Sequence, residues 1–581
     1  IGKISRTGGH LASNLGVVEL TMAIYLVFDL PKDKIIWDVG HQSYTHKILS
    51  GRKGEFDDLR QYGGMSGFPK RKESPCDAFD TGHSSTSISA GLGLAQARDV
   101  SGQDHFVVSV IGDGALTGGM AYEALNNAAR MKKNFIIILN DNNMSISENV
   151  GGMSRYLNGI RTGDGYLDLK KYVTNVLSRI PVIGDELIDK ISRTKNGIKQ
   201  LLIPGMLFEN MGITYLGPVD GHDVKALARA LKEAKKLDHA VLVHVITKKG
   251  KGYEPAEKNP SRFHGVEPFD VLTGESKKEK KNPSYTDVFS KTICQLAEKD
   301  PKITAVTAAM PDGTGLKRFS RLYPDRFFDV GIAEEHAVTS AAGMAAGGLK
   351  PVVAVYSSFL QRGFDQILHD VCIQNLPVVF AIDRAGLVGS DGETHQGIFD
   401  VSFLTSVPNM RIYSPSNYDE LRLCLHKSVE DDSGICAVRY PRGRDQSLYD
   451  TSDPVSTYVY RHIEGAKVLL VTYGRLANDL FTAIEILRNR DIKCDIIKLV
   501  NIFPIDNEVV DIMSAYDAVL FFEEAYYCGS ISEKYASICP NVAQFAIDGF
   551  VKHGKCDVLL DELGFSAEKM ADTVEGFLKD E

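Results

Sequence analysis

Apolar, β-branched runs alternate with helical stretches along most of this 581-residue chain. In the first block, such a run at 105–111 is followed by a glycine turn, a helical stretch at 121–131 and a second run at 135–139. A strand, a helix and a strand in this order form a βαβ unit, and repeated units build a parallel sheet covered by helices on both faces. The pattern returns between 326 and 382 and again from 468, so we expect an α/β fold with three doubly wound domains.

Two polar, turn-rich stretches separate these blocks, at 274–283 (GESKKEKKNP) and at 441–453 (PRGRDQSLYDTSD). Their composition is typical of linkers, and 581 residues exceed what one hydrophobic core usually organises. The segment from about 161 to 210 has helical periodicity and no strand core, so we interpret it as a helical insert of the first domain, packed on the surface or acting as a lid. The expected domains are 1–275, 284–445 and 460–581.

The composition narrows the class of protein. The net charge is -9 without acidic tails or runs, and nothing favours a nucleic-acid partner. Nine cysteines without a CxxC pair indicate reduced thiols and a cytoplasmic protein. No apolar stretch approaches eighteen residues and no signal-peptide pattern is present, so we expect no membrane association. Because the sequence begins with Ile1 and not with Met, we expect that residues preceded it.

The strongest chemical signal consists of GDG at 112–114 and NDN at 140–142, each at the end of an expected strand of one βαβ unit. Ligands of open α/β sheets bind at the carboxyl ends of the strands, where glycines let the backbone approach a diphosphate. Asp113, Asn142 and the backbone carbonyl of Met144 would supply hard oxygen ligands to Mg²⁺. A lone GDG also marks ordinary turns, but its spacing to the asparagine is the thiamine-diphosphate motif.

Longer motifs run along essentially the whole chain. They are TGGHLASNLG at 7–16, WDVGHQSYT at 37–45, GHSSTS at 82–87, TKKGKGY at 247–253, AEEH at 333–336, SSFLQRGFDQ at 357–366 and DRAGLVGSDGETHQ at 383–396. In order and wording they resemble the 1-deoxy-D-xylulose-5-phosphate synthases, a transketolase-like family of thiamine-diphosphate enzymes. The resemblance implies a homodimer that makes an isoprenoid and thiamine precursor from pyruvate and D-glyceraldehyde 3-phosphate with loss of carbon dioxide. This family normally has a helical stretch before GGH, which this sequence lacks.

The resemblance implies a set of cofactor residues in the first domain. They are His41, Gly82, His83, Ser84, Gly114, Ala115, Asn142 and Tyr253, with Lys249 and His264 as weaker candidates near the diphosphate. His10 lies beside glycine in the GGH motif, and we expect it to move substrate protons. A structural role stays open for each histidine.

Thiamine chemistry requires a carboxylic acid that activates the pyrimidine ring. Glu334 follows an expected strand and opens the helical stretch 334–346, and the match to AEEH implies that it is this acid. A glutamate at a helix start also complements the helix dipole, so Glu335 is the alternative. Phe359, in the loop after the next strand, would stack on the pyrimidine or belong to the core.

The acceptor phosphate requires cations. Arg384 and Arg442 both follow strand-like runs, and their guanidinium groups could converge on the phosphate. Four further residues would fill the same rim, with His395 and Asp391 orienting hydroxyls and moving protons: Tyr356, Arg362, Asp391 and His395. The alternative is that these four form a solvated polar loop.

These motifs leave three functions open. The synthase is favoured over ketol transfer between sugars, as in a transketolase, or pyruvate oxidation for a lipoyl partner. A non-catalytic binding module is disfavoured because Asp113, Asn142 and Glu334 are all present. The block from 467 has no concentrated titratable cluster, so we expect it to enlarge the dimer interface.

Overall fold

The computed structural model describes residues 1–144, 151–162, 206–277, 283–431, 433–446 and 457–580. The chain divides into two compact units. The first unit contains residues 1–54, 68–266 and 270–275, and the second contains 55–67, 267–269 and 276–581. Segment 55–67 therefore packs with residues that follow it by more than two hundred positions. Most of the predicted helical insert at 161–210 lies outside the described residues.

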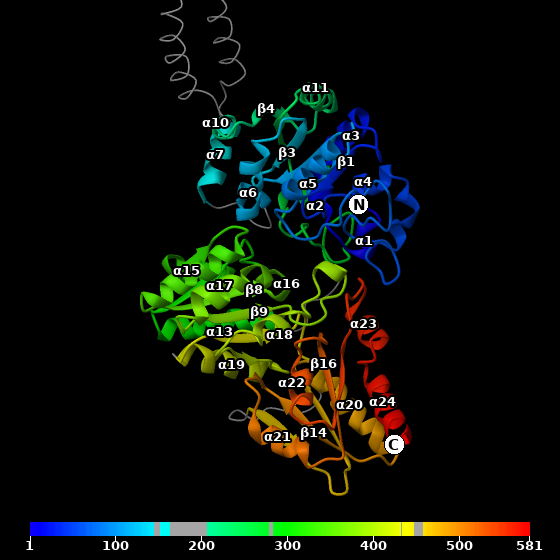
Figure 1. The fold of residues 1–581 in the computed structure, drawn as a ribbon, viewed down its shortest axis with the longest axis vertical. Coiled ribbons are helices and arrows are strands. Elements are labelled where there is room, and N and C mark those ends of the chain that lie inside the picture. The colour runs from blue at the N-terminus through cyan, green and yellow to red at the C-terminus, as the bar shows by residue number, and fades with distance from the viewer. Residues whose placement is uncertain (145–150, 163–205, 278–282, 432, 447–456, 581) are drawn as a thin grey trace, which may run out of the picture. The chain divides into compact units, whose positions relative to one another are not determined.

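The first unit is built on a five-stranded parallel sheet (Figure 1). The strand order is β1 (Lys34–Trp37), β2 (Val107–Gly112), β3 (Phe135–Asp141), β5 (Ala240–Ile246) and β4 (Thr214–Asp220). The main helices are α3 (Val18–Val27), α5 (Ser87–Val100), α6 (Gly119–Ala128) and α11 (Val224–Ala234). Shorter ones are α1 (Ile4–Thr7), α2 (Leu11–Leu15), α4 (Tyr44–Leu49), α7 (Gly151–Thr162), α10 (Met206–Asn210) and α12 (Glu254–Lys258).

Both faces of this sheet are covered, which explains the continuous apolar runs. On β2, Val107 and Ile111 join a core with α5 and α6, whereas Val108 and Val110 join a second core with α3 and α11. Alternate side chains of a strand point to opposite faces, so a strand with helices on both sides must be apolar throughout. The predicted βαβ unit of β2, α6 and β3 is thus confirmed.

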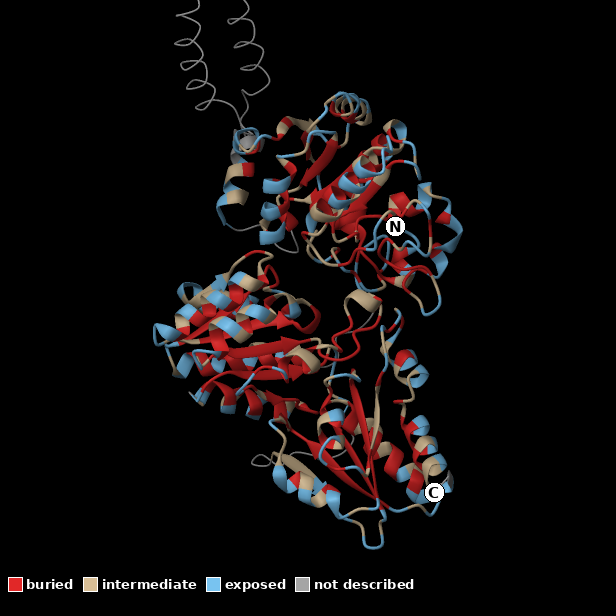
Figure 2. Cartoon of the chain, viewed as in Figure 1, coloured by how far each residue is buried: buried red, intermediate tan, exposed pale blue. Residues whose placement is uncertain are grey.

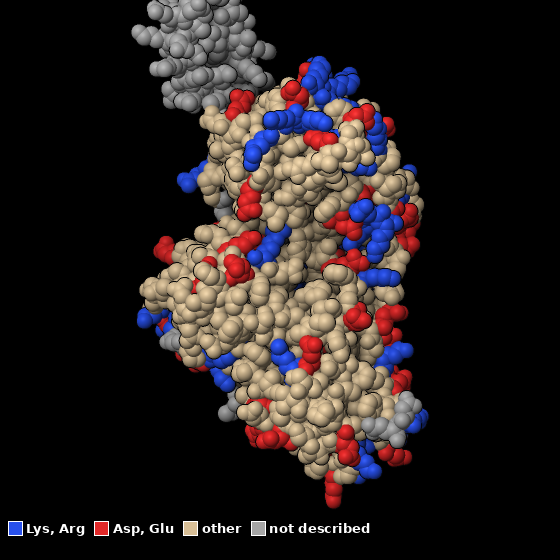
Figure 3. Space-filling model, viewed as in Figure 1, with Lys and Arg blue, Asp and Glu red and all other residues tan. Residues whose placement is uncertain are grey.

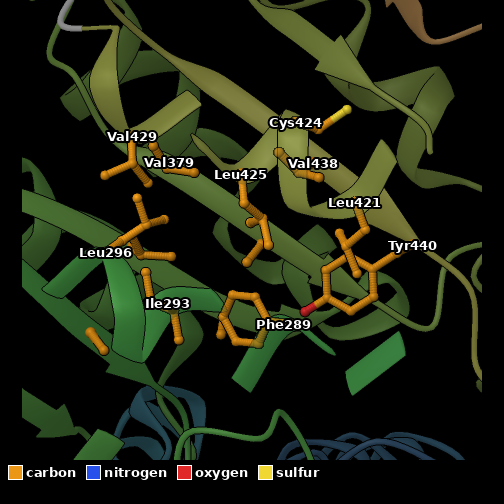
Figure 4. Packing of buried hydrophobic residues seen from close by; sticks show 14 of the residues in the cluster. Phe289, Ile293, Leu296, Val379, Leu421, Cys424, Leu425, Val429, Val438 and Tyr440 are labelled. Atoms are coloured by element: carbon orange, nitrogen blue, oxygen red, sulfur yellow. The ribbon is translucent and has the colours of Figure 1, made fainter. Parts of the chain in front are cut away.

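The second unit contains a seven-stranded sheet that is parallel except at one edge. Its order is β15 (Asn501–Phe503), β10 (Arg411–Tyr413), β11 (Cys436–Tyr440), β9 (Val379–Asp383), β8 (Lys350–Tyr356), β6 (Ile303–Thr307) and β7 (Phe327–Asp329). Residues of α13 (Tyr285–Lys299) and α19 (Tyr418–Glu430) pack on β9 and β11 in its core (Figure 4). The edge strand β15 comes from beyond residue 460, so the last block of the chain completes the middle sheet.

A third sheet follows in the same unit. Its order is β12 (Tyr458–Arg461), β14 (Cys494–Leu499), β13 (Val468–Tyr473), β16 (Ala518–Tyr526) and β17 (Val542–Ile547), and only β12 is antiparallel. The helices around it are α20 (Leu476–Asn489), α21 (Asn507–Ser514), α22 (Ile531–Ala536), α23 (Cys556–Glu562) and α24 (Ala567–Asp580). Its strands are largely buried while the helices show exposed outer faces (Figure 2). Three α/β sheets succeed one another as predicted, and the exact domain limits stay predictions.

The surface shown in Figure 3 carries acidic and basic side chains interspersed, without a broad patch of one sign. Within the described ranges, no helix combines the length and the apolar composition needed to cross a membrane.

Candidate active site

The GDG and NDN motifs meet at the carboxyl ends of β2 and β3. Gly112 is paired with Asn140 in the sheet register, and the amide of Asp113 donates to the carbonyl of Asn140 over 3.2 Å. The Asp113 side chain is buried and forms a hydrogen bond with that of Asp141. The parallel register thus brings together two carboxyl groups that are separated by a helix in the sequence.

The charge balance at this place suits a bound cation. Burial and the neighbouring Asp141 raise the pKa of Asp113 well above its ordinary value, although the buried Lys249 and a hydrogen bond from the backbone of Asn142 oppose this effect. Asp141 itself accepts from His244 Nε2 over 3.0 Å and from the amide of Asn143 over 3.2 Å. Two buried carboxyl groups beside one ammonium group carry an excess of negative charge when both are ionised, and a bound divalent cation would balance it.

The other two predicted metal ligands lie in the turn that follows β3. The Asn142 side-chain oxygen accepts from the amide of Met144 over 3.2 Å, which leaves the second lone pair of that oxygen available. Over the described ranges, no group of three His, Cys, Asp or Glu side chains could hold a metal. A carboxylate and an amide oxygen are hard oxygen ligands of the kind that Mg²⁺ prefers, so the chemistry of Asp113 and Asn142 fits that ion.

The end of β1 organises the GHSS motif. Asp38 accepts from the amides of Ser85 and Ser87 over 2.7 and 3.0 Å, at the start of α5. The Ser85 hydroxyl then donates to the carbonyl of Ala115 over 2.7 Å. The predicted cofactor residues Gly82, His83 and Ser84 are thereby brought to the same sheet edge as Gly114 and Ala115.

Three histidines gather in the first unit. The ring centroids of His10 and His41 are 5.6 Å apart, and His264 lies 6.0 Å from the first and 5.0 Å from the second. Asn14 ties the two motifs together, because its side-chain amide donates to the carbonyls of His10 and His41 over 2.5 and 2.7 Å. The sequence predicts His264 only as a weaker candidate, whereas the fold brings it next to His10 and His41.

Tyr253 contacts residues that lie close to it in the sequence. It precedes α12, its hydroxyl donates to the carbonyl of Val271 over 2.8 Å, and its ring meets Phe263 edge-on at 5.7 Å. These contacts fix the ring, and its predicted role at the cofactor stays a prediction.

Glu334 is the central acid of the second unit. It begins α15 (Glu334–Ala346) directly after β7, and it is buried with 3% of its surface exposed. Within the described chain its Oε2 has no hydrogen-bond partner, and Arg362 Nη1 lies 3.8 Å away. Burial raises the pKa of Glu334 to about 7, although Arg362 opposes this effect. A buried carboxyl group with an unused oxygen fits a residue that meets a ring nitrogen of a cofactor.

Four predicted residues form a continuous stack. The Arg384 guanidinium lies 3.8 Å from the ring centroid of Tyr356, which stacks on Phe359 at 5.5 Å, and Phe359 meets His395 edge-on at 5.5 Å. Phe359 was expected in a loop, but it lies in the short helix α16 (Ser357–Leu360), because the chain turns into a helix at the last residue of β8. Burial lowers the pKa of His395, so its ring is neutral near pH 7.

The segment 387–396, which we call the substrate loop, carries Asp391 and His395. Arg60 Nη2 lies 2.5 Å from Asp391 Oδ1, and Arg442 Nη1 donates to the carbonyl of Val388 over 3.2 Å. Arg60 was not predicted, because segment 55–67 has no motif that would connect it with residues more than three hundred positions away. The solvated-loop alternative is wrong for Asp391, which has a buried ionic partner.

Comparison with known proteins gives the family. Residues 1–247 match the model of 1-deoxy-D-xylulose-5-phosphate synthase, residues 281–445 the pyrimidine-binding domain of transketolase and residues 457–570 the transketolase C-terminal domain. A 1-deoxy-D-xylulose-5-phosphate synthase of Lachnoclostridium phytofermentans is 51% identical over 99% of this chain and 93% of its own length. The chain belongs to the 1-deoxy-D-xylulose-5-phosphate synthase family.

A second 1-deoxy-D-xylulose-5-phosphate synthase, from Caldanaerobacter subterraneus subsp. tengcongensis, is 50% identical over 99% of the chain and 94% of its own length. Among solved structures, a transketolase from Campylobacter jejuni is similar with a TM-score of 0.46 and 18% identity, over 98% of this chain and 96% of its own. The family assignment rests on the sequence relatives alone. The predicted synthase family, its transketolase-like architecture and its dependence on thiamine diphosphate are thereby confirmed.

Proposed function

We propose that this synthase-family chain condenses pyruvate with D-glyceraldehyde 3-phosphate, releasing carbon dioxide and 1-deoxy-D-xylulose 5-phosphate, with thiamine diphosphate and Mg²⁺ as cofactors. The observation that carries the proposal is the joint presence of the Asp113 and Asn142 strand ends and the buried acid Glu334 in a chain 51% identical to a synthase. Thiamine diphosphate supplies, when bound, the carbon nucleophile and the electron sink for decarboxylation and carbon–carbon bond formation.

The first unit would bind the diphosphate end. Asp113 and Asn142 would supply a carboxylate and an amide oxygen to Mg²⁺, with the carbonyl of Met144 as a third ligand. The buried Lys249 would balance the charge of the diphosphate, because it already lies in the field of Asp113. Burial lowers the pKa of Lys249, and a diphosphate beside it would favour the charged form and raise this pKa again.

The second unit would activate the cofactor and bind the acceptor. With a pKa of about 7, the Glu334 carboxyl group can hold a proton at Oε2 and share it with a ring nitrogen. Arg384 and Arg442 would bind the acceptor phosphate with charge-assisted hydrogen bonds. Neutral His395 would be available to exchange a proton with the acceptor oxygen, and the ion pair with Arg60 would hold Asp391 in place beside it.

Ketol transfer between sugars, the reaction of transketolases, is the alternative. Two transketolase domain models match this chain, and this observation keeps the alternative in view. Purified protein should convert pyruvate and D-glyceraldehyde 3-phosphate to the deoxypentulose phosphate only when thiamine diphosphate and Mg²⁺ are added. Turnover of a ketose phosphate donor without turnover of pyruvate would establish the alternative instead.

We also propose a homodimer in a reducing compartment, the cytoplasm. The family resemblance supports the dimer. All nine cysteines lie among the described residues, and none forms a disulfide, which supports the compartment. Light scattering of the holoenzyme at assay concentration should give twice the chain mass, and an active monomer would contradict the dimer.

A further inference from the structure

The substrate loop is closed at its neck by two glycines. Gly386 and Gly397 exchange backbone hydrogen bonds of 2.7 Å in both directions. Leu387 follows Gly386 at the start of the loop, and Ile398 follows Gly397 after the loop has ended. Both side chains are fully buried in the core of the third sheet. The neck therefore belongs to the third sheet, although the loop connects elements of the middle one.

Two charged side chains of the third sheet hold both backbone polar groups of Leu387. The amide of Leu387 donates to Glu524 Oε1 over 2.5 Å, and its carbonyl accepts from Arg475 Nη2 over 3.2 Å. Arg475 and Glu524 also pair with each other, with Nε to Oε2 at 2.8 Å and a second close hydrogen bond from Nη2 to Oε1. We call this closed ring of hydrogen bonds the neck clasp.

The backbone at the neck packs closely against the side chain of Glu524. Gly386 has φ +76°, and a Cβ atom there would lie 2.6 Å from Glu524 Cδ. The amide of Tyr526, two residues after Glu524 on β16, donates to the carbonyl of Ile398 over 2.8 Å. One strand of the third sheet thus fixes the chain on both sides of the loop neck.

The position of the neck influences Arg442 and His395 through the next residue of the loop. Val388, the next residue in the loop, gives its carbonyl to Arg442 over 3.2 Å and its amide to Gln396 Oε1 over 2.6 Å. Gln396 is the neighbour of His395. A shift of Leu387 would therefore be passed on to Arg442 and His395, which the proposed function places at the acceptor.

A buried ion pair of this kind is a weak source of stability, because desolvation offsets most of the attraction, but its directional bonds select one geometry. We propose that Glu524 and Arg475 are positioning residues for the acceptor half of the reaction, acting through Leu387 on the substrate loop. The inference rests on the proposed function for its kinetic consequence, and the geometry of the neck is independent of it. The third sheet thus has a role in the site that its lack of a titratable cluster in the sequence did not predict.

The test compares Glu524→Gln with Glu523→Gln. Glu523 is the preceding residue of the same strand and is also buried, but it accepts from Tyr473, Ile531 and Ser532, all in the third-sheet region and outside the loop. Hydrogen exchange of peptides spanning 384–397 should become faster in Glu524→Gln and stay at the parent rate in Glu523→Gln. The KM of the acceptor should rise about tenfold in Glu524→Gln and stay at the parent value in Glu523→Gln, because tenfold is the scale of one weakened charge-assisted hydrogen bond. The rate of adduct formation with pyruvate alone should stay within a factor of two in both variants.

Arg475→Gln is the second variant, and the double variant Arg475→Gln with Glu524→Gln completes a cycle. If the clasp acts as one unit, the double variant should raise the acceptor KM no more than either single variant. Equal exchange rates and equal KM changes in the Glu523 and Glu524 variants would overturn the inference. Failure of the parent protein to condense the two substrates would overturn the proposed function, whereas the exchange measurement would still decide whether the clasp holds the loop.

Discussion

The proposed metal site of the first unit and the substrate loop of the second unit are assembled in different ways. At the proposed metal site, Asp113 and Asn142 each follow their strand by one residue, and the parallel register of β2 and β3 brings both to the same end of the sheet. In the substrate loop, Asp391 depends on Arg60, and Leu387 depends on Glu524 and Arg475. The first arrangement is local to one βαβ unit, and the second collects residues from three distant parts of the chain.

This difference predicts which property of the protein a substitution should alter. Residues at strand ends are held by backbone hydrogen bonds that a side-chain substitution does not remove, so their variants should lose chemistry and keep their fold. Residues that hold the loop act through other residues, so their variants should alter the binding of one substrate more than the chemistry.

The largest effect is expected for Glu334→Gln. The change is nearly isosteric but removes the carboxyl proton, so cofactor activation should fall by roughly two to four orders of magnitude, the range of general acid–base catalysis. Exchange of the thiazolium proton with deuterated solvent measures this step directly, and Glu335→Gln is the matched control. Exchange as fast as in the parent would show that Glu334 is not the activating acid.

Asp113→Asn should weaken Mg²⁺-dependent cofactor binding by roughly a hundredfold or more, because loss of an outer-sphere partner alone already costs up to that factor. The cofactor-free protein should keep its fold, since burial already favours the neutral form of this carboxyl group. Calorimetry with and without Mg²⁺ measures the loss. Unchanged affinity would remove Asp113 from the site.

Glu334 should also make the cofactor-free protein less stable at high pH. Its pKa is raised from 4.5 to about 7, so the stabilisation is fully present below pH 4.5 and is lost as the pH rises through 7. The difference corresponds to about 3 kcal/mol in the free energy of unfolding. Urea unfolding at about pH 5 and about pH 8 should show Glu334→Gln gaining most of this amount over the parent at the higher pH. A constant difference would mean that the buried carboxyl group has an ordinary pKa.

Arg442→Ala should raise the KM of D-glyceraldehyde 3-phosphate by about ten- to a hundredfold, because an arginine–phosphate hydrogen bond contributes roughly 1.5–3 kcal/mol. Formation of the pyruvate adduct should stay nearly unchanged, and Arg384→Ala should behave alike. Steady-state kinetics against varied acceptor and a spectroscopic adduct signal give the two halves. A parallel fall in both would assign the arginines to structure or to the donor, and an equal loss with an unphosphorylated aldehyde would exclude a phosphate clamp.

The smallest effect is expected for a comparison of two glycines. Gly386→Ala and Gly348→Ala share a left-handed backbone, with φ +76° and +85°, but only the first places its Cβ against Glu524, while the second meets nothing within 4 Å. Both should lose about 1 kcal/mol to backbone strain, and Gly386→Ala should lose about 1 kcal/mol more. Urea unfolding measures this difference, and equal losses would show that the loop neck can move away from β16.

The sequence by itself determined the alternation that builds three largely parallel sheets, and with it the strand ends at which Asp113 and Asn142 lie in the first sheet and the position of Glu334 after a strand of the second. It also determined the family, because its motifs extend over the whole chain. These features depend on the apolar periodicity of strands and helices and on where the strands end, and both can be recognised in the sequence.

Only the tertiary structure decided how the substrate loop is held. No local pattern connects Arg60 with Asp391, or Glu524 with Leu387, because each pair is joined by packing between segments more than a hundred residues apart. The same holds for the strand β15, which the last block of the chain adds to the middle sheet. Contacts of this kind depend on which apolar faces bury one another, and many distant segments of similar composition could satisfy that requirement.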